Sequence, residues 1–129
     1  MTSPAYASPP IGAHFSAVVL RPAPPHPVRL ALTGELDLAA AAALGVALAE
    51  VLSGPTQPPR VQVDLTSVTF MDTAGMEEFL HVRATLEQLG VRVEMLGAQG
   101  QCLRLMRVAA RLGWLRTAVA SDLPGTGGD

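Results

Sequence analysis

Short apolar segments alternate with longer stretches of helical periodicity along this chain, and this alternation constrains the fold more than any other feature. Four short segments rich in Val and Leu are predicted strands: residues 14–21, 28–34, 61–65 and 91–96. Three longer stretches repeat apolar residues every three or four positions and are predicted helices: residues 38–52, 73–89 and 101–112. The order predicts an α/β fold, with a single mixed β-sheet of four to five strands and helices packed on it.

Proline and glycine mark the ends of these elements. The Pro-rich residues 22–27 separate the first two strands and predict a hairpin. Pro55 follows the first helix, and Gly90 is predicted at the C′ position of the second. Residues 114–119 are predicted to form a last short strand or helical turn. Apolar residues at helical spacing are predicted to face the core: Ala41, Leu44, Leu48, Val51 and Leu52 in the first helix, Met76, Phe79, Leu80, Val82, Leu86 and Leu89 in the second, and Leu105, Val108, Ala109 and Leu112 in the third.

The length of 129 residues predicts one domain. Residues 1–12 are rich in Pro, Ser and Ala and are expected to form a flexible arm; residues 13–120 are expected to fold, and residues 121–129 to form a flexible tail. The first residues lack the basic and apolar regions of a signal peptide. No apolar stretch approaches the ~20 residues that a membrane-spanning helix needs. A soluble, cytoplasmic protein without membrane insertion is therefore expected.

Composition argues against several classes of function. The net charge is −2 and the chain has no lysine, which disfavours nucleic-acid binding and excludes a P-loop or Schiff-base lysine. Cys102 is the single cysteine, so neither an internal disulfide nor cysteine chelation of zinc is expected. His14, His26 and His81 lack metal-site spacing. With no G-x-S-x-G elbow and no Gly-rich dinucleotide loop, we expect no enzymatic activity, no catalytic residue, no cofactor and no metal.

Two acidic turns follow predicted strands. Asp37 comes after the second strand and Asp72 after the third, each just before a predicted helix. An ordinary helix cap explains either residue by itself. Because the carboxyl ends of parallel strands open on the same edge of a sheet, however, both turns are expected on one surface, where α/β folds commonly bind ligands.

Thr73 lies in the segment Asp72-Thr73-Ala74-Gly75 at the start of the second helix. Capping by Asp72 or Thr73 is the simpler interpretation of this tetrapeptide. The alternative is a phosphorylation site, because a phosphate on Thr73 would lie at the positive end of the helix dipole. In that interpretation, Gly75 lets a partner backbone approach closely.

Three segments occur in an order that resembles a known family: residues 32–37 (Leu-Thr-Gly-Glu-Leu-Asp), residues 63–76 around Asp72 and Thr73, and residues 96–98 before the arginine-bearing third helix. Together they resemble the STAS domain family, in particular the stand-alone bacterial anti-sigma factor antagonists. The resemblance covers about residues 14–120. It implies a STAS-like fold.

The resemblance also implies a mechanism. In this family the unphosphorylated antagonist binds an anti-sigma factor that is also a serine/threonine kinase, which frees a sigma factor. Phosphorylation weakens the complex and a phosphatase restores it. The hydroxyl residue after the motif's aspartate is modified, and here that residue is Thr73. The implied partner-binding residues are Glu35, Asp37, Asp72, Thr73, Ala74, Gly75 and Met76. The family commonly has serine at the modified position, and Ala74 replaces its second hydroxyl.

Two other functions stay open at this point. The chain could be an unphosphorylated STAS scaffold or accessory module in a signalling assembly or beside a transporter. It could also bind a small ligand or nucleotide on the edge with the acidic turns.

Overall fold

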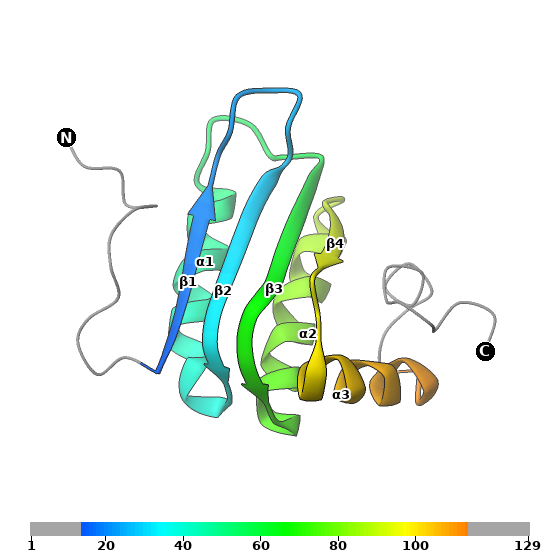
Figure 1. The fold of residues 1–129 in the computed structure, drawn as a ribbon. Coiled ribbons are helices and arrows are strands. Elements are labelled where there is room, and N and C mark those ends of the chain that lie inside the picture. The colour runs from blue at the N-terminus through cyan, green and yellow to red at the C-terminus, as the bar shows by residue number, and fades with distance from the viewer. Residues whose placement is uncertain (1–13, 114–129) are drawn as a thin grey trace.

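Two parallel strands, β2 (Val28–Leu36) and β3 (Arg60–Met71), form the middle of the sheet in the computed structural model, which describes residues 14–113. Strand β1 (Phe15–Leu20) pairs antiparallel with β2, and β4 (Arg92–Leu96) pairs parallel with β3. The strand order is β1-β2-β3-β4 (Figure 1). The predicted hairpin and the predicted mixed sheet are both confirmed.

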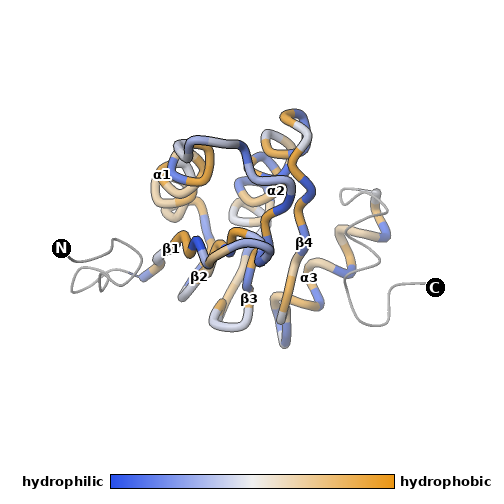
Figure 2. The backbone as a smooth tube through the Cα atoms, turned by 90° about the horizontal axis from the view of Figure 1, so that it is seen from above, coloured by the Kyte–Doolittle hydropathy of each residue, from blue (hydrophilic) through white to orange (hydrophobic). Residues whose placement is uncertain are grey.

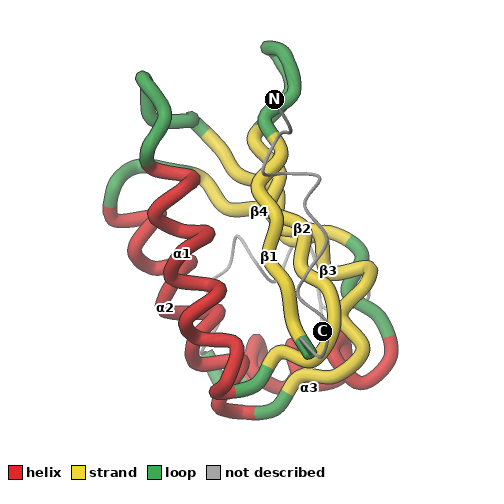
Figure 3. Tube along the Cα trace, turned by 90° about the vertical axis from the view of Figure 1, so that its left-hand side faces the viewer, coloured by secondary structure: helices red, strands yellow, loops and turns green. Residues whose placement is uncertain are grey.

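Three α-helices pack on this sheet. A 3-10 turn (Leu38–Ala40) leads into α1 (Ala41–Leu52), and α2 (Thr73–Gln88) and α3 (Gly100–Arg111) follow β3 and β4. Seen from above, α1 and α2 lie on one side of the strands and α3 on the other (Figure 2). The side view shows α1 and α2 next to each other along the sheet (Figure 3). The crossovers from β2 to β3 and from β3 to β4 each contain one of these two helices, as parallel pairing requires.

The core lies between the sheet and the pair α1 and α2. Alternate residues of β2 and β3 point into it, and Leu30, Leu32 and Val63 are each 1% exposed. Phe79 of α2 and Leu44 of α1 meet them from the helices and are equally buried. With few aromatic residues in the chain, this core is largely aliphatic, and its cohesion comes from the burial of many medium-sized side chains.

Strand β3 extends well beyond the predicted residues 61–65. Its burial alternates up to Leu65, and then Thr66 and Ser67 are both exposed before Val68 is buried. The register between β2 and β3 shifts twice in this region, between Ala31 and Thr33 and again between Gly34 and Glu35. A bulge breaks the alternation that marks a strand in a sequence, although the backbone pairing continues to Met71.

The predicted helix faces are partly wrong at their carboxyl ends. Leu89 of the second helix is 46% exposed, because it lies in the cap after α2 has ended. Val108 and Leu112 are 48% and 60% exposed, whereas α3 buries Cys102, Met106 and Ala109. Val108 lies on a different face of α3 from the buried Met106 and Ala109, and Leu112 lies in the cap after the helix has ended. The other predicted core positions are buried or half-buried: Ala41, Leu44, Leu48, Val51, Leu52, Met76, Phe79, Leu80, Val82, Leu86, Leu105 and Ala109.

Several predictions concern residues that the structure does not describe. The predicted arm at residues 1–12, the predicted tail at residues 121–129 and the element predicted at residues 114–119 lie outside residues 14–113. Within those described residues, no helix has the length and apolar character needed to cross a membrane.

Truncation of Phe79 distinguishes the core from the end of α2. We expect Phe79→Ala to lower the free energy of unfolding by about 3–5 kcal/mol, because the side chain is 1% exposed and its removal leaves a cavity. Leu89→Ala is the matched control and should cost about 1 kcal/mol or less. Urea denaturation followed by circular dichroism measures both; equal costs would contradict the placement of Leu89.

Candidate functional site

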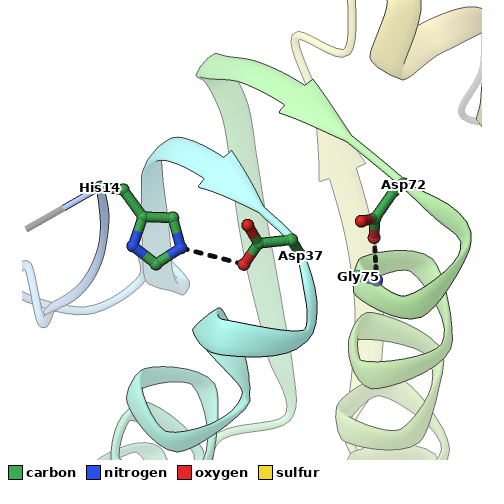
Figure 4. Close-up of polar contacts among 4 residues, drawn as sticks. All are labelled: His14, Asp37, Asp72 and Gly75. Atoms are coloured by element: carbon green, nitrogen blue, oxygen red, sulfur yellow. Dashed lines mark hydrogen bonds and ion pairs between the residues drawn. The ribbon is translucent and has the colours of Figure 1, made fainter.

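The carboxyl ends of β2 and β3 lie side by side. Leu36 and Met71 are paired across the two strands, and Asp37 and Asp72 are the next residues in each chain segment. Figure 4 shows their carboxyl groups at the same end of the sheet. We call residues 35–37 and 72–74 the acidic edge. The predicted juxtaposition of the two acidic turns is confirmed.

Asp72 caps helix α2. Its backbone is extended (φ −108°, ψ −179°), and its Oδ1 accepts a hydrogen bond of 2.7 Å from the backbone N–H of Gly75 (Figure 4). This satisfies one of the N–H groups that the first turn of a helix leaves without an intrahelical partner. Thr73 is the first residue of α2 and is exposed. Since Asp72 provides the cap, the Thr73 side chain is not needed to cap the helix.

Gly75 is buried, and the backbone that approaches it belongs to the same chain. A Cβ atom at this position would lie 1.8 Å from the carbonyl oxygen of Leu36. The first turn of α2 therefore packs directly on the end of β2. The sequence analysis expected Gly75 to admit the backbone of a partner, whereas in the structure it admits the backbone of Leu36. Met76, the next residue, has 0% exposure. Two of the seven predicted partner-binding residues, Gly75 and Met76, are therefore buried beneath the acidic edge. The other five are at least partly exposed: Glu35, Asp37, Asp72, Thr73 and Ala74.

His14 joins the acidic edge, although no sequence pattern predicted it there. Its Nε2 lies 2.9 Å from Oδ1 of Asp37 (Figure 4). The hairpin brings it there: the N–H of Glu35 donates to the His14 carbonyl at 2.9 Å. Gly34, with φ +98°, allows this approach, because a Cβ there would lie 2.0 Å from the same carbonyl oxygen. Knowledge of the hairpin register would have been the only signal for this contact.

Asp37 differs from Asp72 in what its carboxylate does. It precedes the 3-10 turn, yet its side chain makes no capping hydrogen bond. Asp37 thus occupies the expected N-cap position with an extended backbone (φ −130°, ψ −170°), but its Oδ1 bonds to His14. That hydrogen bond is the main reason why the pKa of Asp37 is lowered and the pKa of His14 is raised. Desolvation opposes the raised pKa of His14, and the charges of Asp37 and Glu35 each contribute less than desolvation does.

Gln101, from the first turn of α3, bonds to the backbone of Met71 next to the acidic edge. Its Oε1 accepts a hydrogen bond of 2.9 Å from the N–H of Met71, and its Nε2 donates to the Met71 carbonyl. Met71 immediately precedes Asp72. The sequence placed Gln101 at the start of the third helix but did not connect it with Thr73.

The acidic edge presents carboxylates and one exposed hydroxyl, that of Thr73. Within residues 14–113, no group of three His, Cys, Asp or Glu side chains is arranged to hold a metal ion. Cys102 is buried in the packed face of α3, and burial raises the pKa of its thiol to about 11, so the reactive thiolate is scarce at neutral pH.

A family model described as "Mlab, STAS domain" matches residues 19–114. That range includes both acidic turns. No curated protein matches the chain significantly.

Solved structures share the fold at low sequence identity. A sulfate transporter family protein from Wolinella succinogenes superposes with a TM-score of 0.56 at 17% identity, over 73% of this chain and 72% of the other. The STAS domain of an antisigma-factor antagonist from Rhodobacter sphaeroides gives 0.53 at 15%, over 66% and 88%. An anti-sigma factor antagonist from Mycobacterium paratuberculosis gives 0.52 at 21%, over 84% of each chain. At such identities, these likenesses establish the fold.

Two glycines in helices should respond oppositely to alanine. Gly75→Ala places a methyl group against the Leu36 carbonyl, so we expect a loss of about 3 kcal/mol or more in the free energy of unfolding. A Cβ atom added at Gly45 of α1 would meet nothing within 4 Å, so Gly45→Ala should stabilise by about 0.5–1 kcal/mol. Urea denaturation measures both. Similar effects of the two substitutions would show that α2 does not rest on β2 as described.

The pair of His14 and Asp37 should titrate as a unit. The raised pKa of His14 means that the pair stabilises the fold fully below pH 6.5 and loses this contribution as the pH rises through the folded-state pKa. The lowered pKa of Asp37 means that its contribution is present above pH 3.8 and is lost as the pH falls through its folded-state pKa. Both contributions are therefore complete between about pH 4 and 6.5.

A titration of His14 followed by NMR checks this coupling. We expect a pKa above 6.5 in the wild type and a return toward 6.5 in Asp37→Asn. Asp72→Asn, which removes the other carboxylate of the edge, is the control and should leave the His14 pKa unchanged. A His14 pKa that does not respond to Asp37→Asn would contradict the ion pair.

Proposed function

Because the chain belongs to the STAS domain family, we propose that it binds a protein partner through the acidic edge and is switched by phosphorylation of Thr73. In this proposal it acts as an anti-sigma factor antagonist. The unmodified protein binds an anti-sigma factor with serine/threonine kinase activity in the cytoplasm, and a sigma factor is released. A phosphatase returns the phosphorylated form to the binding state. The chain itself contributes binding and no catalysis.

One observation carries the proposal: Thr73 is exposed at the first position of α2, while its neighbour Asp72 provides the cap. A phosphate on Thr73 would lie near the N–H groups of the first helical turn, at the positive end of a 16-residue helix. The fold can accept the modification at little cost for this reason. Kinase access also requires an exposed hydroxyl, and Thr73 meets that condition.

The same phosphate changes what a partner meets. It adds a charge of about −1.5 to −2 to an edge that already carries Glu35, Asp37 and Asp72. A partner surface that packs against a neutral hydroxyl would then have to desolvate a dianion among carboxylates, which is costly. We therefore expect phosphorylation to weaken the complex.

Similarity to solved anti-sigma factor antagonists supports this choice of partner class. A second candidate has support of the same kind. The fold is equally similar to a sulfate transporter family protein and to part of SLC26A9, where the likeness covers 22% of that chain. In the alternative, the chain is an unphosphorylated scaffold or accessory module of a transport or signalling complex, and the acidic edge binds its partner constitutively.

Phosphate incorporation tests the switch. We expect extracts of the source cell, supplied with labelled ATP, to transfer a single phosphate to the wild-type chain and none to Thr73→Ala. Thr69→Ala is the matched control, because Thr69 is also exposed and lies on β3 close to the edge. It should accept phosphate as the wild type does. Phosphate that persists in Thr73→Ala, located by mass spectrometry, would show that the site is elsewhere.

Partner capture separates the two candidates. Proteins retained by the wild type and by Thr73→Glu from the same extract are identified by mass spectrometry. The switch predicts an ATPase of the kinase class that is retained by the wild type and at least about tenfold less by Thr73→Glu. Equal retention of a transporter component by both forms would favour the accessory module.

A further inference from the structure

Strand β3 extends beyond the end of its neighbour β4. Pairing between the two strands ends where Asp64 meets Leu96, whereas β3 continues to Met71. Beyond Asp64, therefore, no strand within residues 14–113 pairs with the side of β3 that faces away from β2. Backbone N–H and C=O groups at such a position need other partners, because leaving them unsatisfied in a partly buried site costs free energy.

Two glutamine amides bond to β3 where β4 no longer does. Gln99 donates from Nε2 to the carbonyl of Thr66 at 2.9 Å. Gln101 bonds to both backbone groups of Met71, accepting from the N–H and donating to the carbonyl. A primary amide carries the same donor and acceptor pair as a peptide unit, so Gln101 imitates one residue of a neighbouring strand.

The position of Met71 makes the Gln101 contact important for the edge. On its other side, Met71 pairs with Leu36 of β2. It is thus held from two elements, β2 and α3, and the next two residues along the chain are Asp72 and Thr73. The direction in which the backbone leaves Met71 determines where the cap and the hydroxyl point.

We propose that Gln101 is a positioning residue for Thr73, through which helix α3 sets the geometry of the acidic edge. Any displacement of the amino-terminal turn of α3 would break both hydrogen bonds to Met71 and loosen the start of α2. The effect of Gln101 on partner binding rests on the function proposed above. The positioning itself is a property of the free chain and is tested there.

Gln99 supplies a matched control. It is the N-cap residue of α3, two positions before Gln101, and also bonds to β3, but at Thr66, which is about 16 Å from Met71 along an extended strand. If glutamine contacts with β3 merely stabilise the fold, loss of either amide should have similar effects. If Gln101 positions the edge, only loss of the Gln101 amide should weaken the hydrogen bonds of the first turn of α2.

Amide hydrogen exchange of the full chain, followed residue by residue by NMR, is the test. The reporters are the N–H groups of Met71, Gly75 and Met76, which bond to Gln101, Asp72 Oδ1 and the Asp72 carbonyl. In Gln101→Ala we expect exchange to rise about tenfold at all three, since one or two hydrogen bonds that hold the turn are lost. In Gln99→Ala, exchange at these three amides should stay within twofold of the wild type.

Two outcomes would overturn the proposal. One is exchange at Gly75 and Met76 that stays within twofold of the wild type in Gln101→Ala. The other is an equal rise in both glutamine variants, which would indicate general loosening. If Gln101→Ala does not fold, Gln101→Met decides, because it keeps the length of the side chain and lacks both amide groups. None of these results depends on a kinase, so failure here leaves the phosphate-incorporation test of Thr73 intact.

Discussion

The acidic edge is built around the backbone of Leu36. This residue pairs with Met71, and its carbonyl oxygen accepts the N–H of Asp72 at 3.3 Å. The same carbonyl lies so close to Gly75 that no side chain fits there. One peptide group at the end of β2 thus determines where β3 ends and how α2 begins. Leu36 itself is fully buried, so the hydrophobic core anchors this arrangement.

Each polar side chain of the edge makes a different contact. Asp72 caps helix α2, and Asp37 bonds to His14 across the hairpin. Gln101 bonds to the backbone just before Asp72. Each of these side chains satisfies a structural requirement, and Thr73 has no such role in the cap. An exposed hydroxyl that the cap does not use is consistent with the proposed phosphorylation, since a phosphate there would leave the hydrogen bonds of the edge intact.

The fold follows from the sequence where periodicity is regular. The order of elements, the hairpin and the start of α2 at Thr73 were all predicted, because alternating apolar residues, Gly and Pro mark them locally. The predictions were wrong where the alternation breaks or a helix ends. The register shifts between β2 and β3 interrupt the alternation in the second half of β3. Val108 lies off the buried face of α3, and Leu112 lies in the cap after that helix.

Chain direction is enough to predict that Asp37 and Asp72 follow parallel strands, and hence that they share an edge with Thr73. The side chains that complete this edge could be identified only in the folded chain. Folding brings His14 and Gln101 to the edge and places Gly75 and Met76 inside it. These positions depend on strand register and on contacts between segments that are distant in sequence. Local sequence patterns do not determine such contacts.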